Sequence, residues 1–375
     1  MRNFKPGSLK SQGHYKSFEP APINRHWSID NMEIALLLSK ADRELGRLDM
    51  YSEYIPNLDL FISMHVVKEA TQSSKIEGTQ TNLQEALLDR EDVPLNKRDD
   101  WEEVQNYIEA MRHAISRLNE LPFSSRLIKE THKILLQGVR GAHKTPGDYR
   151  KIQNWIGGAS IEDAVFVPPA HTSVETLMAD LEKFVHNDSD LLPELLKIAL
   201  IHYQFETIHP FLDGNGRVGR LLITLYLVSK KILKQPVLYL SDFFERNRSL
   251  YYDNLMSARE KNDLTQWFKF FLVGVTETAQ KGIQTFDNIL QLKKQIEQDI
   301  SALGNRAANA QAVVNQLYKR PLINAPMIAG ITGLTPKSVY KLIATFEELG
   351  ILREVTGGKR KKLYLFQDYI NLFYA

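Results

Sequence analysis

The chain has 375 residues, of which 43% are apolar and 25% are charged, and its formal net charge is +2. This composition is typical of a globular protein in water, and it gives no overall positive charge for nucleic acid. The sequence contains no cysteine, which excludes disulfides, thiolate zinc sites and a cysteine nucleophile. No apolar run approaches the roughly 20 residues of a membrane span, and no apolar signal region is present. We therefore expect a cytoplasmic protein with no membrane partner.

Helical periodicity dominates the first third of the chain, after an arm over residues 1–30 that is rich in Pro, Gly, Ser and Lys and is expected to be irregular. The apolar spacing predicts one helix capped by Asp30 and a second helix that follows Asn57 and ends near Ser73–Ser74. A third amphipathic helix is predicted over residues 100–120.

Residues 141–170 combine turn-forming residues with two short strand patterns. The patterns cover Lys151–Ile156 and Ala164–Val167, and the turn Gly157–Gly158 follows the first of them. This arrangement predicts a β-hairpin in an otherwise helical protein. Loops of this kind are usually placed for a partner or a substrate.

Two segments, Leu195–Thr207 and Val218–Val228, are apolar on nearly every side, which predicts two buried central helices joined by a glycine-rich segment. His202 on the first of them is expected to be a hydrogen-bonded core residue. Residues 264–300 predict a long helix or a helix pair whose polar later half connects to the tail.

The tail, residues 303–375, follows a helix–helix–turn–helix pattern with a final hairpin, which is typical of a winged helix. Thr335 is expected to cap the third helix. The basic turn Lys359–Lys362, with Lys337 and Lys341 on that helix, suits phosphate contacts with DNA. Docking on another protein, or on a second copy in a homodimer, is the alternative.

The segment Asp213–Arg220 carries the clearest chemistry. Its glycines precede and begin a buried helix, where backbone N–H groups attract anions. Arg217 and Arg220 are one turn apart and suit two phosphates, while Asp213 suits Mg²⁺. His209 is placed to act as a general base. Each of these residues alone has an ordinary structural explanation, but their combination within twelve residues favours a functional site.

The segment His209–Arg220 matches the signature His-Pro-Phe-x-Asp-Gly-Asn-Gly-Arg-x-x-Arg at every defined position, and the chain therefore resembles the Fic family of protein adenylyltransferases. Residues 145–170 resemble the Fic flap, which aligns a target segment by strand addition. Arg248–Leu255 resembles the adenosine-side helix of the family. The resemblance covers most of the chain. It implies a mainly α fold, with a Fic helical core, a short β-hairpin flap and a C-terminal winged helix-turn-helix domain.

The resemblance and the patterns together predict four segments. They are an N-terminal arm and helical region with an inhibitory motif (1–105), a Fic catalytic domain (106–285), a helical connector (286–302) and a winged-helix domain (303–375).

The resemblance also implies an activity, the transfer of AMP from Mg·ATP to a Tyr, Thr or Ser hydroxyl of a target protein or of the chain itself. His209 would deprotonate the hydroxyl, and Asp213 would hold Mg²⁺ against the α- and β-phosphates. Arg217 and Arg220 would hold the β- and γ-phosphates. Related Doc-type kinases have a lysine where this chain has Gly216, so this glycine favours AMP transfer over phosphate transfer.

Several further residues are implied in nucleotide binding. Backbone amides of the loop would bind phosphate oxygens, and the Asn215 side chain would orient the α-phosphate. These candidates are Gly214, Asn215, Gly216, Val218 and Gly219 in the motif, Asn154, Trp155, Ile156 and Gly157 in the flap, and Tyr251 and Tyr252 beyond it. The sequence departs from some relatives at or near Arg259, where they have an asparagine that contacts the nucleoside.

The segment from Ser73 to Gly78 resembles the inhibitory motif of the family, Ser/Thr-x-x-x-Glu-Gly/Asn. If Glu77 reaches Arg220, it occupies the guanidinium that the γ-phosphate needs. The resemblance therefore implies an autoinhibited enzyme. Two alternatives remain open: Glu77 also supports removal of AMP, or the protein is a transcription regulator that uses the Fic domain as a nucleotide sensor.

Overall fold

The computed structural model describes residues 4–54, 59–138, 141, 143–189, 191–358 and 361–374, with the side chains of 53–54 and 59–61 left out. These residues are mainly helical, as the sequence predicts, and contain two small antiparallel sheets. The α-helices are α1 (Met32–Tyr54), α2 (Asp59–Ile76), α3 (Arg98–Arg117), α4 (Ser125–Leu135), α5 (Val174–Val185), α6 (Glu194–Ile208), α7 (Asn215–Ser229), α8 (Ser241–Arg246), α9 (Arg248–Lys261), α10 (Leu264–Ser301), α11 (Ala307–Lys319), α12 (Ala325–Thr332), α13 (Pro336–Glu348) and α14 (Gln367–Asn371). Within the described part, none of the helices has the length and apolar character of a membrane span.

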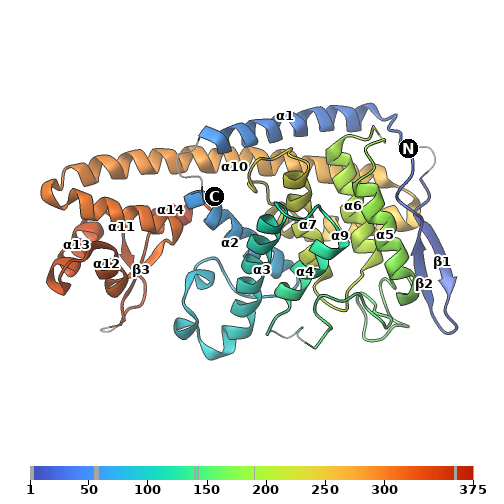
Figure 1. Cartoon of the computed structure of the whole chain (residues 1–375), viewed down its shortest axis with the longest axis horizontal. Helices are drawn as coiled ribbons and strands as arrows, with labels where there is room; N and C mark the ends of the chain where they lie inside the picture. The colour runs from blue at the N-terminus through green and yellow to red at the C-terminus, as the bar shows by residue number, and fades with distance from the viewer. Residues whose placement is uncertain are drawn as a thin grey trace.

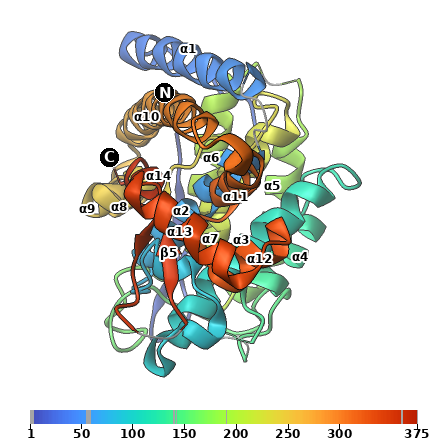
Figure 2. The same cartoon turned by 90° about the vertical axis from the view of Figure 1, so that its left-hand side faces the viewer.

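The centre of the molecule is the pair α6 and α7, which is buried as predicted. Every residue from Leu195 to Ile208 is buried, because this helix is apolar on all sides and is covered on all sides. His202 donates from Nδ1 to the carbonyl of Gly219 (2.9 Å) and accepts from the Tyr251 hydroxyl (2.8 Å), which confirms its place as a core residue. Both views show α1 lying along the long helix α10 above this core (Figures 1 and 2).

The N-terminal arm differs from the prediction. Residues 1–30 are not irregular throughout, because β1 (Gly7–Ser11) and β2 (Lys16–Pro20) form an antiparallel hairpin. Phe18 of β2 is buried beside Phe166, with ring centroids 5.9 Å apart, and its N–H donates to Val167. The strands are stabilised by this long-range contact with the flap, which local composition does not reveal.

The cap of α1 differs from expectation. Asn31, not Asp30, caps α1, since its side-chain oxygen accepts from the N–H groups of Glu33 and Ile34. α2 ends within one turn of its predicted end, whereas Asn57, where we expected its start, lies outside the described residues.

The predicted hairpin of the flap is reduced to one antiparallel bridge between Ile156 and Phe166. The N–H of Ile156 donates to Phe166 (2.8 Å), and the N–H of Val165 donates to Ile156 (2.9 Å). Gly157 and Gly158 both have positive φ and form the predicted turn. The strands do not extend further because Pro168 and Pro169 cannot donate to a ladder.

The C-terminal region has the predicted order of three helices followed by a hairpin. After α11, the strands β3 (Leu322–Asn324), β4 (Arg353–Glu354) and β5 (Leu363–Leu365) form a sheet in the order β3-β5-β4. α12 packs against β3 and against α13. The predicted connector is the second half of α10, a single helix of 38 residues. β3 and α14 were not predicted.

Two details of the tail depart from the sequence-based expectations. Thr335 stands at the N-cap position of α13 but its hydroxyl contacts the Ser338 hydroxyl (3.1 Å) and caps no backbone N–H. In the basic turn, Lys361 and Lys362 are described, whereas Lys359 and Arg360 lie outside the described residues.

Candidate active site

A cavity of about 560 Å³ lies between the flap and helices α6, α7 and α9. It gathers nine of the residues singled out from the sequence. They are Glu77, Trp155, Ile156, Gly157, His209, Gly216, Arg220, Tyr251 and Tyr252. Segments far apart in the sequence therefore meet at the predicted motif.

His209 ends α6 in a left-handed conformation, with φ 49° and ψ 60°. This backbone is strained for a residue other than glycine and persists only where the surroundings hold it. Here the carbonyl of His209 accepts from Nε of Arg150 (2.9 Å) and from Nδ2 of Asn154 (3.4 Å). Arg150, which the sequence did not single out, also donates to Pro169 (2.6 Å), so it fastens the flap to the end of α6.

The imidazole of His209 is set up to accept a proton. Its Nδ1 is buried and has no hydrogen-bond partner among the described residues. Burial, with the charges of Arg259 and Arg150, lowers the pKa of His209 to about 4, and the charge of Glu77 opposes this shift. The ring is therefore neutral at pH 7 and suits a general base.

The loop before α7 is shaped by Gly214 and Asn215. Gly214 stands at the N-cap position with φ 76°. The Asn215 side chain accepts from the N–H of Phe211 (2.8 Å) and donates to its carbonyl (2.9 Å). The side chain therefore closes the loop, and the backbone N–H groups of α7 supply the positive helix end.

His132 on α4 supports this loop, and sequence reasoning missed it. Its Nδ1 accepts from the N–H of Gly147 (2.8 Å), so Nε2 donates to the carbonyl of Asp213 (3.0 Å). The ring stacks on Phe211 with centroids 3.7 Å apart. Burial lowers the pKa of His132 to about 4, which keeps this tautomer neutral. A histidine on an amphipathic helix carries no local signal for such a role.

Arg220 is buried and is hydrogen-bonded to residues at the end of α2. Its Nε donates to the Ser73 hydroxyl (2.9 Å), and its Nη2 donates to the Ser73 carbonyl (2.9 Å) and to Oε1 of Glu77 (2.7 Å). Burial opposes ionisation of Glu77, but the charge and hydrogen bond of Arg220, together with the charge of Arg217, outweigh it and lower the pKa of Glu77. Glu77 is thus ionised and forms an ion pair with Arg220.

Gly216 permits this contact. A Cβ at this position would lie 2.3 Å from Oε1 of Glu77 and 2.9 Å from Nη1 of Arg220. Any side chain here would displace the carboxylate. Gly78, directly after Glu77, has φ 102°, a conformation that glycine adopts without strain and that ends α2 at this point.

Arg217 and Asp213 do not line the cavity. Arg217 is buried, with Nη1 3.5 Å from Oε2 of Glu103 on α3 and Nη2 3.5 Å from Oδ1 of Asp213. The Asp213 carboxylate is 43% exposed, and no group of three or more metal-ligating side chains occurs in the described residues. A single accessible carboxylate fits Mg²⁺, which keeps several waters and binds chiefly through substrate phosphates.

Asn154, Val218 and Gly219 were also predicted, and they pack around the site without lining the cavity. Asn154 donates to the carbonyl of Phe211 (2.9 Å), and Val218 is fully buried in the core. A Cβ on Gly219 would lie 2.2 Å from Oε1 of Glu206, so this glycine lets α6 approach α7.

Glu206 lines the cavity one turn before His209 and was not predicted. It is buried, and its Oε1 has no partner among the described residues. Burial raises the pKa of Glu206 to about 7, with Arg220 opposing the shift. The sequence offered one indication of this role: Glu206 stands three residues before His209, a spacing that places two residues on the same face of a helix.

Arg259 lines the cavity from α9 and connects it to the flap. Its guanidinium carbon lies 4.0 Å from the centroid of the Phe166 ring, a cation–π contact. Its Nε donates to the Thr207 hydroxyl (3.1 Å). The position that departs from some relatives is therefore part of the cavity wall.

Two family models match the chain. Residues 35–116 match "Fic/DOC family N-terminal" and residues 122–227 match "Fic/DOC family", so together they cover half of the sequence. The chain is 27% identical over 219 residues to "Protein adenylyltransferase Fic" of Drosophila melanogaster, covering 57% of this chain and 41% of that protein. It is 25% identical over 242 residues to a "Probable protein adenylyltransferase" of Aquifex aeolicus, covering 62% and 70%. The chain thus spans less than half the length of the Drosophila relative.

Solved structures share the fold. A Fic family protein from Desulfovibrio desulfuricans aligns with a TM-score of 0.60 at 20% identity, over 91% of this chain and 98% of that one. Fic-1 from C. elegans aligns with a TM-score of 0.53 at 20% identity, over 70% and 75%. The motif, the fold and both family models agree, and the chain belongs to the Fic/DOC family through its N-terminal and Fic domains.

Proposed function

We propose that the protein is an adenylyltransferase that moves AMP from ATP to a hydroxyl of a protein side chain. One observation carries the proposal: a single cavity joins the neutral imidazole of His209 to Gly216 in the first turn of α7 and to the guanidinium of Arg220. The names of the Drosophila and Aquifex relatives support the same activity.

The chemistry follows from these groups. The hydroxyl oxygen attacks the α-phosphorus of ATP and gives its proton to the unpartnered nitrogen of His209. The bond between the α-phosphorus and the oxygen bridging to the β-phosphate breaks, and pyrophosphate leaves with that electron pair. The N–H groups at the start of α7 and the charge of Arg220 stabilise the growing negative charge on phosphate oxygens.

The Asp213 carboxylate fits a Mg²⁺ ion carried by the nucleotide, which would neutralise charge on the α- and β-phosphates. Two hydrogen bonds hold Asp213 in place. Its carbonyl accepts from the His132 ring, and its Oδ1 accepts from the N–H of Gly214 (2.6 Å).

We further propose that Glu77 restrains the enzyme. Its carboxylate takes the guanidinium edge of Arg220 that a terminal phosphate would need, and its own charge repels that phosphate. Nucleotide that enters the cavity is then held away from the pose required for attack.

The test uses ATP labelled at either the α- or the γ-phosphate with wild-type protein, Glu77→Gly, and Glu77→Gly combined with His209→Ala. We expect label from the α-phosphate alone to enter protein, strongly in Glu77→Gly and not in the double variant. Incorporation of γ-label would overturn AMP transfer, and undiminished α-label in the double variant would overturn the role of His209.

A further inference from the structure

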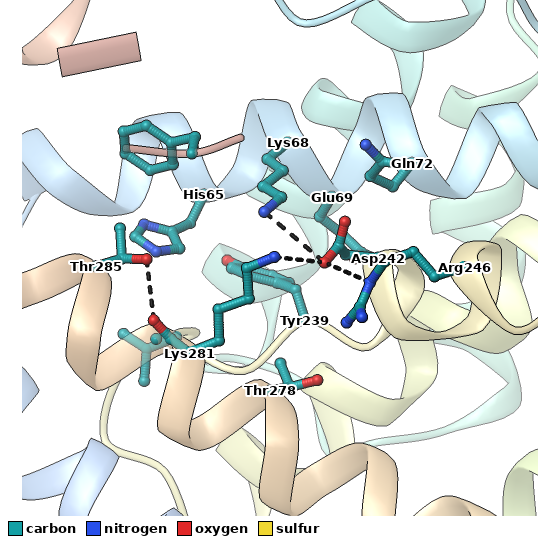
Figure 3. Close-up of a pocket in the computed structure, with 13 residues that line it drawn as sticks. His65, Lys68, Glu69, Gln72, Tyr239, Asp242, Arg246, Thr278, Lys281 and Thr285 are labelled. Carbon is teal, nitrogen blue, oxygen red and sulfur yellow. Dashed lines mark hydrogen bonds and ion pairs between the residues drawn. The ribbon is translucent and has the colours of Figure 1, made fainter. Parts of the chain in front are cut away.

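A second cavity, which shares no lining residue with the nucleotide pocket, lies between α2, α8, α10 and Phe373. Figure 3 shows three cationic side chains converging there on Asp242. Its Oδ2 lies 3.9 Å from Nζ of Lys68, 3.3 Å from Nζ of Lys281 and 3.4 Å from Nε of Arg246. One carboxylate thus faces three positive charges.

The other carboxylate that lines the cavity, Glu69, does not balance this charge. It is buried and accepts from the N–H and hydroxyl of Ser241 and from the hydroxyl of Tyr107 (3.1 Å). Burial raises the pKa of Glu69, whereas its hydrogen bonds to Ser241 and Tyr107 and the charge of Arg220 lower it. With both carboxylates counted as anions, three cationic side chains still face two carboxylates. The cavity therefore has a surplus of positive charge from the described residues that line it.

The cations of this cavity oppose one another. Burial lowers the pKa of Lys68, and the charges of Lys281 and Arg246 also lower it, while Asp242 and Glu69 oppose them. The 3.9 Å contact between Lys68 and Asp242 is also too long for a hydrogen bond, so the ammonium donors of Lys68 are not used there. An added anion would relieve this repulsion.

Two buried polar atoms in the same wall lack partners. The hydroxyl of Tyr239, a residue that is 7% exposed, has no hydrogen bond among the described residues. Burial raises the pKa of this hydroxyl, so it remains a donor. The side-chain oxygen of Gln72 is likewise unpartnered, and an amide flip would present its NH₂ group instead. Buried polar groups left in this way usually mark a missing partner.

The size of the cavity limits the occupant. Its volume is about 50 Å³, whereas one water needs only about 10–15 Å³ of such space. It can hold one small oxyanion and is too small for a nucleotide. Arg246, with 47% of its side chain exposed, stands at the open side.

We propose that this cavity binds a single tetrahedral oxyanion of the phosphate class, held by the ammonium groups of Lys68 and Lys281 and by the hydroxyl of Tyr239. The occupant joins α2 to α10 and to the segment before α8. The source is either free phosphate or a phosphate monoester that enters past Arg246.

The test is calorimetric titration of the full chain with inorganic phosphate, with phosphoserine and with chloride, at constant ionic strength. Tyr239→Phe removes one donor and keeps the ring, and Lys281→Met removes one cation. Lys293→Met is the matched control, since it lies on the same helix and pairs with Glu297 outside the cavity. Melting curves establish that each variant is folded.

We expect phosphate to bind and chloride not to bind. Each cavity variant should weaken phosphate binding by about tenfold or more, because it loses one hydrogen bond or ion pair to a charged group. The control variant should bind phosphate as the wild type does. Binding of phosphoserine as well would identify a monoester as the source, and its failure would identify free phosphate. No phosphate binding, or binding unchanged in folded Tyr239→Phe and Lys281→Met, would overturn the proposal.

Discussion

Replacing Glu77 by Gln tests the restraint without changing the shape of the side chain. The amide oxygen can still accept from Arg220, but the charge is lost. Arg220 stays charged, so the hydrogen bond is retained and only the attraction between the two charges is lost. Because one end of the pair is exposed to solvent, that attraction is worth about 1 kcal/mol at most. That corresponds to about a fivefold rise in the fraction of protein with Arg220 available to ATP.

Glu77→Gly removes the whole contact and should act more strongly. The Glu77 side chain is 36% exposed whereas that of Arg220 is 1% exposed, so solvent screens one end of the pair. Hydrogen bonds of charged groups contribute about 1.5–3 kcal/mol, and because of this screening we take the lower part of that range, about 1.5–2.3 kcal/mol, which predicts a gain of about 10- to 50-fold. The expected order of AMP-transfer rates is wild type, then Gln, then Gly.

The assay is the initial rate of α-label incorporation at ATP concentrations below saturation. Lys75→Met is the control, because Lys75 is two residues from Glu77 and forms an ion pair with Glu245 at the surface (2.9 Å). Such pairs contribute at most about 1 kcal/mol, so the control should change the rate by less than about fivefold. Equal rates for wild type and both Glu77 variants, or full activation by Lys75→Met, would refute the reasoning.

Three further substitutions test the supporting structure. Arg150→Lys removes the planar guanidinium that holds the carbonyl of His209, and urea unfolding should show a loss of about 2 kcal/mol or more. Burial raises the pKa of Glu206 to about 7, so its side chain becomes negative above that pH and repels ATP. The ATP affinity of the wild type should therefore fall from about pH 6 to about pH 8. Calorimetry should show no such fall in Glu206→Gln. Burial lowers the pKa of His202 to about 3 from 6.5, so the unfolded state takes up the proton first on acidification. The unfolding free energy of wild type relative to His202→Gln should therefore fall by about 2 kcal/mol from about pH 7.5 to about pH 5, and a constant difference would contradict this.

The parts of the site that were predictable from the sequence are local. The twelve-residue motif placed His209 and Arg220, and the uniform apolar character of α6 and α7 placed both helices in the core. Glu77 and Arg220 are 143 positions apart, and hydrophobic periodicity cannot predict a contact between them. The resemblance to the family's inhibitory motif indicated this contact.

The features that escaped prediction depend on long-range packing. Phe18 pairs an N-terminal hairpin with the flap, and His132 on α4 holds the carbonyl of Asp213, 81 positions away. Arg150 bonds the end of α6 from 59 positions away. None of these residues stands in a distinctive local pattern, so their roles follow only once the helices are placed.

The most direct test of the proposed activity is the intact mass of Glu77→Gly after incubation with Mg·ATP, with Glu77→Gly/His209→Ala treated in parallel. We expect the mass of the single variant, or of an added target protein, to rise by one AMP, and the double variant to produce no change. A rise by one phosphate, or an AMP adduct that persists without His209, would contradict the account.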